Sequence, residues 1–128
     1  MKKLLITTAI IEFTTGLILV FFPTVIAALL SGSSPDSPSA LTVARVAGLA
    51  LISLGIACWL SRNEKRGKAV NGLVTAMTVY NIGVIIVFIY SAISLGLSGI
   101  GLWPVVLVHL AMSVWCISWL LKNHPHQE

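Results

Sequence analysis

Charged residues are scarce in this chain. Lys, Arg, Asp and Glu make up 9% of its 128 residues, whereas 57% are hydrophobic. A typical soluble domain carries about 25% charged residues. This chain has too few charged residues to form the hydrated surface of a soluble protein. We therefore expect it to be surrounded by lipid. The chain is also too short for more than one domain.

Cysteines and metal ligands are few as well. The only two cysteines, Cys58 and Cys116, fall toward the same end of their apolar stretches. Buried cysteines usually act as small hydrophobes, and a reducing compartment disfavours a disulfide, although a redox pair is an alternative. No metal-ligand spacing occurs, and His124 and His126 lie on a polar tail expected to be solvated. Without a catalytic signature, we do not expect the chain to be an enzyme by itself.

Four long apolar stretches dominate the sequence instead. A bilayer core requires roughly 20 apolar residues per helix. We therefore predict an all-α, polytopic membrane protein, a four-transmembrane-helix bundle that occupies residues 1–128 as one domain. The expected spans are about 4–22, 40–61, 69–91 and 102–121. Pro23 disfavours helical geometry before it, so we expect a short interfacial helix over about 24–30, or a kinked continuation.

The basic residues cluster outside the apolar stretches. By contrast, the connection between the first and second spans, Ser31 to Ser39, has Asp36 as its single charged residue. This asymmetry predicts a multi-pass protein of a bacterial-type cytoplasmic (inner) membrane with both termini cytoplasmic, whose partner is the lipid bilayer. We expect no nucleic-acid binding, because the charges form no extended patch. The clustered basic residues are Lys2, Lys3, Arg62, Lys65, Arg66, Lys68 and Lys122.

Glu12 and Arg45 are the only charged residues inside the four stretches. At 1.5 Å per residue, Glu12 lies near mid-membrane, while Arg45, Asn81 and His109 lie in the outer half, so these four could meet. One reading is structural: a Glu12–Arg45 pair, with Asn81 and His109 hydrogen bonding between helices. The other is a ligand-binding site or proton relay, because ionisable residues inside membranes are usually functional. Arg45 could instead extend to the head groups and leave Glu12 unpaired.

The functional reading constrains the chemistry. A carboxyl group away from water and cations favours its neutral form, so Glu12 could carry a proton. His109 could donate to a carbonyl or titrate by itself. Together they suit a quinone head group or a proton-coupled substrate. A haem is not expected, because no second axial ligand is evident.

Small residues mark faces on which helices could approach closely. Gly48 and Gly55 are seven residues apart among alanines, and Gly72 and Gly83 lie in the third stretch. Such faces permit close helix packing. We expect them to serve packing within the bundle first and formation of a homo-oligomer, or contact with other membrane subunits, second.

Three segments resemble parts of small bacterial four-helix membrane proteins, including DoxX-like ones. They are Phe22-Pro23 before a short apolar segment, Ala44-Arg45-Val46-Ala47-Gly48, and Leu54-Gly55. The resemblance covers about the first half of the chain. It implies a four-helix membrane fold and, for some DoxX-like proteins, a link to quinone-dependent oxidation, but it assigns no functional residue.

Glu12 is also similar to the membrane glutamate of small multidrug transporters. The long outer connection and the third and fourth spans depart from that family's pattern. Three functions therefore stay open: a subunit or accessory protein of a membrane assembly, a binding protein for a lipidic or quinone-like ligand, and a proton-coupled transporter or channel that uses Glu12.

Overall fold

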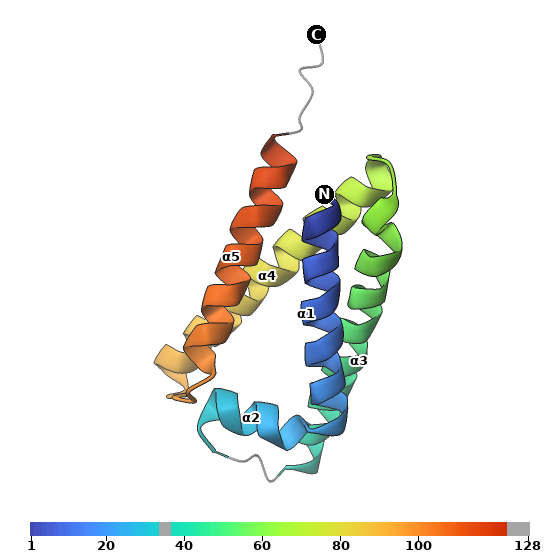
Figure 1. Ribbon diagram of the computed structural model, residues 1–128. Coiled ribbons are helices and arrows are strands. Elements are labelled where there is room, and N and C mark those ends of the chain that lie inside the picture. Colours follow the sequence, from blue (N-terminus) through green and yellow to red (C-terminus); the bar gives the residue numbers. More distant parts are fainter. Residues whose placement is uncertain (34–36, 123–128) are drawn as a thin grey trace.

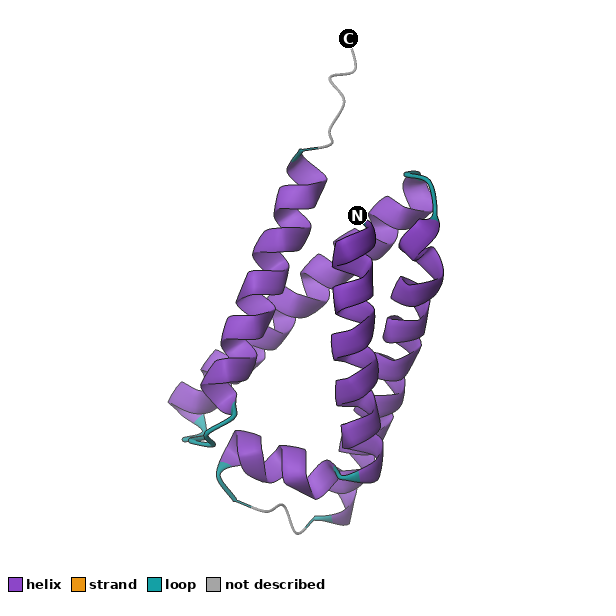
Figure 2. Cartoon of the chain, in the orientation of Figure 1, coloured by secondary structure: helices purple, strands orange, loops and turns teal. Residues whose placement is uncertain are grey.

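All regular secondary structure is helical in residues 1–33 and 37–122, the part of the chain that the computed structural model describes (Figure 2). Four of the helices are long and apolar enough to cross a bilayer, which suggests a multi-pass membrane protein. The expected all-α class is therefore confirmed. Asp36, His124 and His126 lie outside the described residues. The elements are α1 (Lys2–Phe21), α2 (Pro23–Ser31), α3 (Pro38–Leu60), the 3₁₀ turn η1 (Ser61–Asn63), α4 (Lys68–Ser94) and α5 (Leu102–Leu121).

The break between α1 and α2 follows from Pro23. Phe22 leaves the helical region, with φ −130° and ψ 52°, and Pro23 then opens α2, where its missing N–H is not needed. The second helix ends at Gly32, which adopts a left-handed conformation with φ 82°. The segment is thus a separate helix rather than a kinked continuation of α1, and it lies across one end of the bundle (Figure 1).

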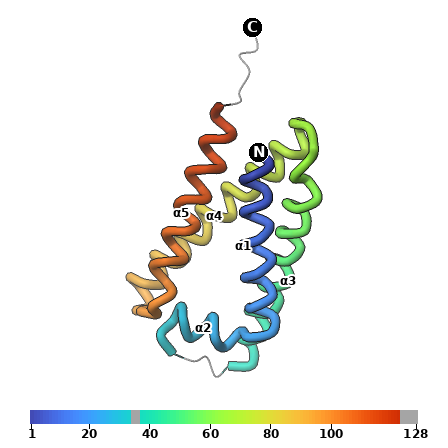
Figure 3. Tube along the Cα trace, in the orientation of Figure 1, coloured from blue at the N-terminus to red at the C-terminus, as the bar shows by residue number. Residues whose placement is uncertain are grey.

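The long helices form two pairs, in which α1 packs along α3 and α4 packs along α5 (Figure 3). The start of α1, the connection between α3 and α4, and the end of α5 lie at the same end of the bundle (Figure 1). We call this the basic end, because all the basic residues except Arg45 lie there. At the other end, α2 lies beside the connection between α4 and α5.

Glycines bring the backbones of α1 and α3 into direct contact. A Cβ atom on Gly16 would lie 2.6 Å from the Gly48 carbonyl oxygen, and one on Gly48 would lie 2.8 Å from the Gly16 carbonyl oxygen. Gly55 approaches the backbone of Phe13 in the same way. The expected packing role of Gly48 and Gly55 is confirmed, and Gly16 on α1 is their counterpart.

The glycines of α4 have no such role within the chain. No atom lies within 4 Å of a Cβ added to Gly72 or Gly83. The expectation that they serve close packing within the bundle is therefore wrong. Both positions leave open space on α4, so their small size does not decide how α4 and α5 meet.

A hydrophobic core joins the two helix pairs in the half of the bundle near the basic end. It contains side chains from all four long helices. Because the backbones of the two pairs come close to each other at few points, the pairs contact each other there mainly through these side chains. Burial of this apolar surface also fixes which face of each helix points inward. The core residues are Leu4, Leu5, Ala9, Cys58, Val74, Met77, Met112 and Cys116.

At the other end, α2 is attached to the connection between α4 and α5 by backbone hydrogen bonds. The Gly101 N–H donates to the Leu29 carbonyl at 2.8 Å, and the Gly99 N–H donates to the Leu30 carbonyl at 3.2 Å. A Cβ on Gly99 would overlap these carbonyl groups. Glycine is therefore required there for close approach, and α2 links the α1–α3 pair to the α4–α5 pair.

Candidate functional site

Glu12 lies in the interior of the bundle. Its side chain is 5% exposed, and its carboxylate has no hydrogen bond or ion pair with any described residue. It lies close enough to the Cys58 thiol on α3 and the Tyr80 hydroxyl on α4 to interact with both electrostatically. The carboxylate therefore faces the boundary between the two helix pairs.

Two buried hydroxyl groups near this boundary also lack a partner. Thr8 is one helical turn from Glu12 on the same face of α1, and Ser113 lies on α5 beside the core residue Met112. Neither Oγ1 of Thr8 nor Oγ of Ser113 has a hydrogen-bond partner among the described residues. Serine and threonine inside helices can bond to the carbonyl four residues earlier, but these two do not. Buried polar groups are rarely left without a partner, so this region has unused hydrogen-bonding capacity.

Arg45 is placed elsewhere. Its side chain is exposed, and its Nε–H donates to the Val20 carbonyl at 3.4 Å, in the last turn of α1. A cation there is favourable, because the last carbonyls of a helix have no partner within the helix and carry partial negative charge. The structure thus does not pair Arg45 with Glu12, and Glu12 is left unpaired.

Asn81 and His109 each make a hydrogen bond to a carbonyl of their own helix. The Asn81 Nδ2–H donates to the Met77 carbonyl at 2.7 Å, and His109 Nδ1 lies 2.8 Å from the Val105 carbonyl, to which its N–H donates. Asn81 is buried and His109 is half-buried. Of the four predicted site residues, these two therefore lie within the α4–α5 pair and form no polar lock between helices.

Tyr80 connects this pair to Glu12. Its ring centroid lies 5.9 Å from that of His109, with the ring planes inclined by 59°, while its hydroxyl lies within electrostatic range of Glu12. Sequence reasoning missed Tyr80, because tyrosine inside an apolar stretch is usually an interfacial anchor. Its position beside Asn81, in the middle of the third stretch, was the available signal. We call Thr8, Glu12, Cys58, Tyr80 and His109 the Glu12 site.

Cys58 and Cys116 are free and buried in the hydrophobic core. The Cys116 thiol lies within hydrogen-bonding reach of the Thr78 hydroxyl, which joins α5 to α4. No group of three residues able to hold a metal ion occurs in residues 1–33 and 37–122.

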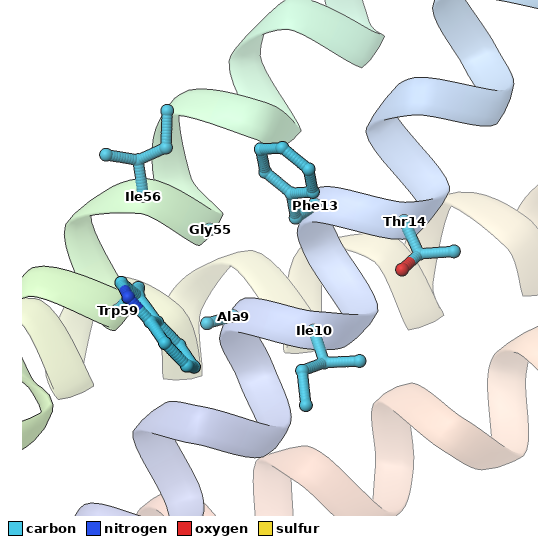
Figure 4. A pocket seen from close by; sticks show the side chains of 7 residues that line it. All are labelled: Ala9, Ile10, Phe13, Thr14, Gly55, Ile56 and Trp59. Atoms are coloured by element: carbon cyan, nitrogen blue, oxygen red, sulfur yellow. The ribbon is translucent and has the colours of Figure 1, made fainter.

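Glu12 lines neither of two hollows on the surface of the described residues. The first is an apolar groove of about 350 Å³ between α1 and α3, which Figure 4 shows from close by. The second, of about 490 Å³, lies between α2 and the connection between α4 and α5. The first is lined by Ala9, Ile10, Phe13, Thr14, Gly55, Ile56 and Trp59, and we call it the α1–α3 groove.

Residues 6–126 match the sequence profile of a family described as a domain of unknown function, DUF8292. The chain belongs to this family. No curated protein and no solved structure matches it. Membership of DUF8292 assigns no chemistry to the Glu12 site and makes no connection to DoxX-like proteins, so that resemblance stays a prediction. The geometry of the described residues is the basis for a functional proposal.

Proposed function

We propose that this DUF8292 protein is a multi-pass protein of a bacterial-type inner membrane, with both termini in the cytoplasm. The support is the basic end, where positive charges from three separate segments gather, while the half of the bundle near α2 carries only Arg45 among its described residues. Positively charged connections are retained on the cytoplasmic side during insertion.

The orientation is tested by labelling introduced cysteines in intact cells with a membrane-impermeant maleimide, in a background with Cys58→Ala and Cys116→Ala. Ser33→Cys at the α2 end should react from outside, and Glu64→Cys at the basic end should react only after lysis. Labelling of Glu64→Cys in intact cells would overturn the orientation.

Within that membrane, the proposed role is a subunit or accessory protein of a membrane assembly that binds a lipidic, quinone-like ligand at the Glu12 site. The observation that carries this role is the buried Glu12 carboxyl group without a partner, one turn from the unpartnered Thr8 hydroxyl. A neutral carboxyl group and a hydroxyl can both donate hydrogen bonds to the carbonyl oxygens of a quinone. An ionisable group at membrane depth is costly, which favours a functional reason for Glu12.

A second candidate is a small proton-coupled transporter or channel. The observation that favours it is Tyr80, whose ring contacts that of His109 and whose hydroxyl is within electrostatic range of Glu12. Carboxyl, phenol and imidazole groups can each accept and donate a proton, so their succession across α1, α4 and α5 is suited to a relay.

Two substitutions of Glu12 test the candidates. Glu12→Gln keeps the size of the side chain and a hydrogen-bond donor but removes its ability to carry a proton, and Glu12→Leu also removes the donor. Tryptophan fluorescence of the purified protein is titrated with a short-chain benzoquinone, and proton flux is measured in proteoliposomes. We expect Glu12→Leu to lower quinone affinity by up to about tenfold, as for the loss of one buried hydrogen bond, whereas Glu12→Gln keeps a donor and should retain most of the affinity. Arg45→Gln, outside the site, should leave affinity unchanged.

The two candidates give different results. Loss of quinone affinity without any wild-type proton flux supports the binding protein, whereas flux that Glu12→Gln abolishes supports the transporter. Unchanged binding in Glu12→Leu together with unchanged flux in Glu12→Gln, with altered stability alone, would contradict both.

A further inference from the structure

The α1–α3 groove has a floor of small residues and walls of large apolar ones. Ala9 and Gly55 form the floor, because their small size lets the two helices leave a depression between them. Side chains from both helices border it, and several are well exposed, such as Ile10 at 57% and Trp59 at 44% (Figure 4). Its only polar lining side chain is Thr14. The groove is therefore an apolar channel on the outer surface of the helix pair.

The groove leads toward the basic end. Trp59, which lies near the end of α3, carries the Arg62 guanidinium 4.1 Å from its ring centroid, and Arg62 also donates a hydrogen bond to the Trp59 carbonyl. The tryptophan ring thus lines the groove and positions a cation at its mouth.

A second cation approaches this mouth from α1. Lys3 precedes Ile10 by seven residues, close to two helical turns, so it shares the face of α1 that borders the groove. The start of α1 also contacts η1, which contains Arg62. Arg62 in η1 and Lys3 in α1 therefore place positive charge where the groove approaches the basic end.

We infer that the α1–α3 groove binds one acyl chain of an anionic phospholipid, whose phosphate is held by Arg62 and Lys3. An apolar channel capped by two cations is complementary to a lipid that has an apolar chain and a negative head group. The inference depends on the proposed membrane location and is independent of the Glu12 site, which lies in the interior between the helix pairs.

The chain contains a matched control for this arrangement. Arg66 lies over the Trp119 ring at 4.6 Å, also at the basic end, but Trp119 lines neither of the two hollows. If basic charge alone attracted the anionic lipid, Arg62 and Arg66 would contribute equally to the lipid preference. If the lipid binds in the groove, binding requires Arg62 and does not depend on Arg66.

The test measures quenching of Trp59 by lipids with brominated acyl chains. A chain with Trp103, Trp115 and Trp119 replaced by phenylalanine is placed in lipid nanodiscs that contain brominated phosphatidylglycerol or brominated phosphatidylcholine at equal fraction. We expect phosphatidylglycerol to associate about thirtyfold more strongly, since each of the two basic residues contributes on the order of 1 kcal/mol. Arg62→Gln and Lys3→Gln should together bring the ratio close to one, and Arg66→Gln should leave it unchanged.

Three results would overturn the inference. The first is equal quenching by the two lipids in the parent chain, and the second is an equal loss of preference in Arg62→Gln and Arg66→Gln. The third is weak quenching by both lipids that rises as the chain is diluted in the bilayer, which would show that a second copy fills the groove. Circular dichroism of every variant verifies that helix content is retained, so that loss of folding is not mistaken for loss of lipid.

Discussion

The two helix pairs are held together in different ways. In the α1–α3 pair, Gly16 and Gly48 place backbone against backbone, so the helices have little freedom to shift. In the α4–α5 pair, the contacts come from side chains, including the rings of Tyr80 and His109 and the hydroxyl of Thr78 near the Cys116 thiol. Side chains can change rotamer while packed backbones cannot. The first pair is therefore suited to be a rigid support, and the second to adjust.

Glu12 lies where these two kinds of packing meet. It belongs to the glycine-packed pair, yet its neighbour Tyr80 belongs to the other. The boundary between the pairs is held by the hydrophobic core near the basic end and by the attachment of α2 to Gly99 and Gly101 at the other end. Motion of one pair relative to the other would thus change the surroundings of Glu12 more than those of the α1–α3 groove.

The largest effect is expected from enlarging a glycine between α1 and α3. Gly48→Leu forces the two backbones apart, because even a Cβ there would lie 2.8 Å from the Gly16 carbonyl oxygen. Overpacking of this kind costs about 3 kcal/mol or more in the free energy of unfolding. Unfolding in mixed detergent micelles measures it.

The matched control is Gly83→Leu on α4, where no atom lies within 4 Å of an added Cβ. It should change the free energy of unfolding by less than about 1 kcal/mol, since a residue with higher helix propensity replaces glycine in open space. Equal destabilisation by the two substitutions would remove the distinction between the pairs.

A smaller effect is expected where α2 joins the two pairs. Gly99→Ala places a methyl group against the Leu29 and Leu30 carbonyls, so it should detach α2 and break two backbone hydrogen bonds. Each such bond is worth about 1 kcal/mol, which predicts a loss of about 2 kcal/mol. Hydrogen exchange should become faster at the Gly101 amide.

Gly67→Ala serves as the control, because its added Cβ would meet no atom within 4 Å. Exchange at Gly101 should be unchanged in this variant. If Gly99→Ala left exchange at Gly101 as slow as in the parent chain, α2 would not be what joins the two pairs.

The smallest effect on stability is expected at Glu12 itself. If a hydrogen bond or ion pair of Glu12 held two helices together, substitution of Glu12 would lower the free energy of unfolding. Glu12 has no such partner among the described residues. Glu12→Gln should therefore change the free energy of unfolding by less than about 1 kcal/mol, since a neutral carboxyl group and an amide of the same size cost about the same to bury. A loss of 2 kcal/mol or more, measured in the same micelles, would mean that Glu12 is a structural contact.

The apolar stretches made most of the fold predictable. Helices α3 and α5 begin and end within a few residues of the expected spans, and Pro23 marked the start of α2 correctly. These features depend on local signals: a run of apolar residues, a missing N–H, a glycine. The close approach of Gly99 to α2 was not predictable, because α2 lies far away in the sequence.

The candidate site was predictable only in part. Glu12 stood out because its charge lies within an apolar stretch, and this does not depend on its neighbours. Its relation to Arg45 could not be read from depth, since depth does not say which face of α3 points inward. The structure turns Arg45 outward to the Val20 carbonyl and brings Tyr80 toward Glu12 instead.

By itself, the sequence determined the helical class, the number of long apolar helices and the isolation of Glu12 among apolar residues. All three follow from composition and from signals along the chain. Only the tertiary structure decided that the helices pair as α1 with α3 and α4 with α5, that Arg45 faces outward, and that Glu12 has no partner among the described residues. Those outcomes depend on which helix faces meet, and packing between distant segments sets this through glycine contacts and the shared hydrophobic core.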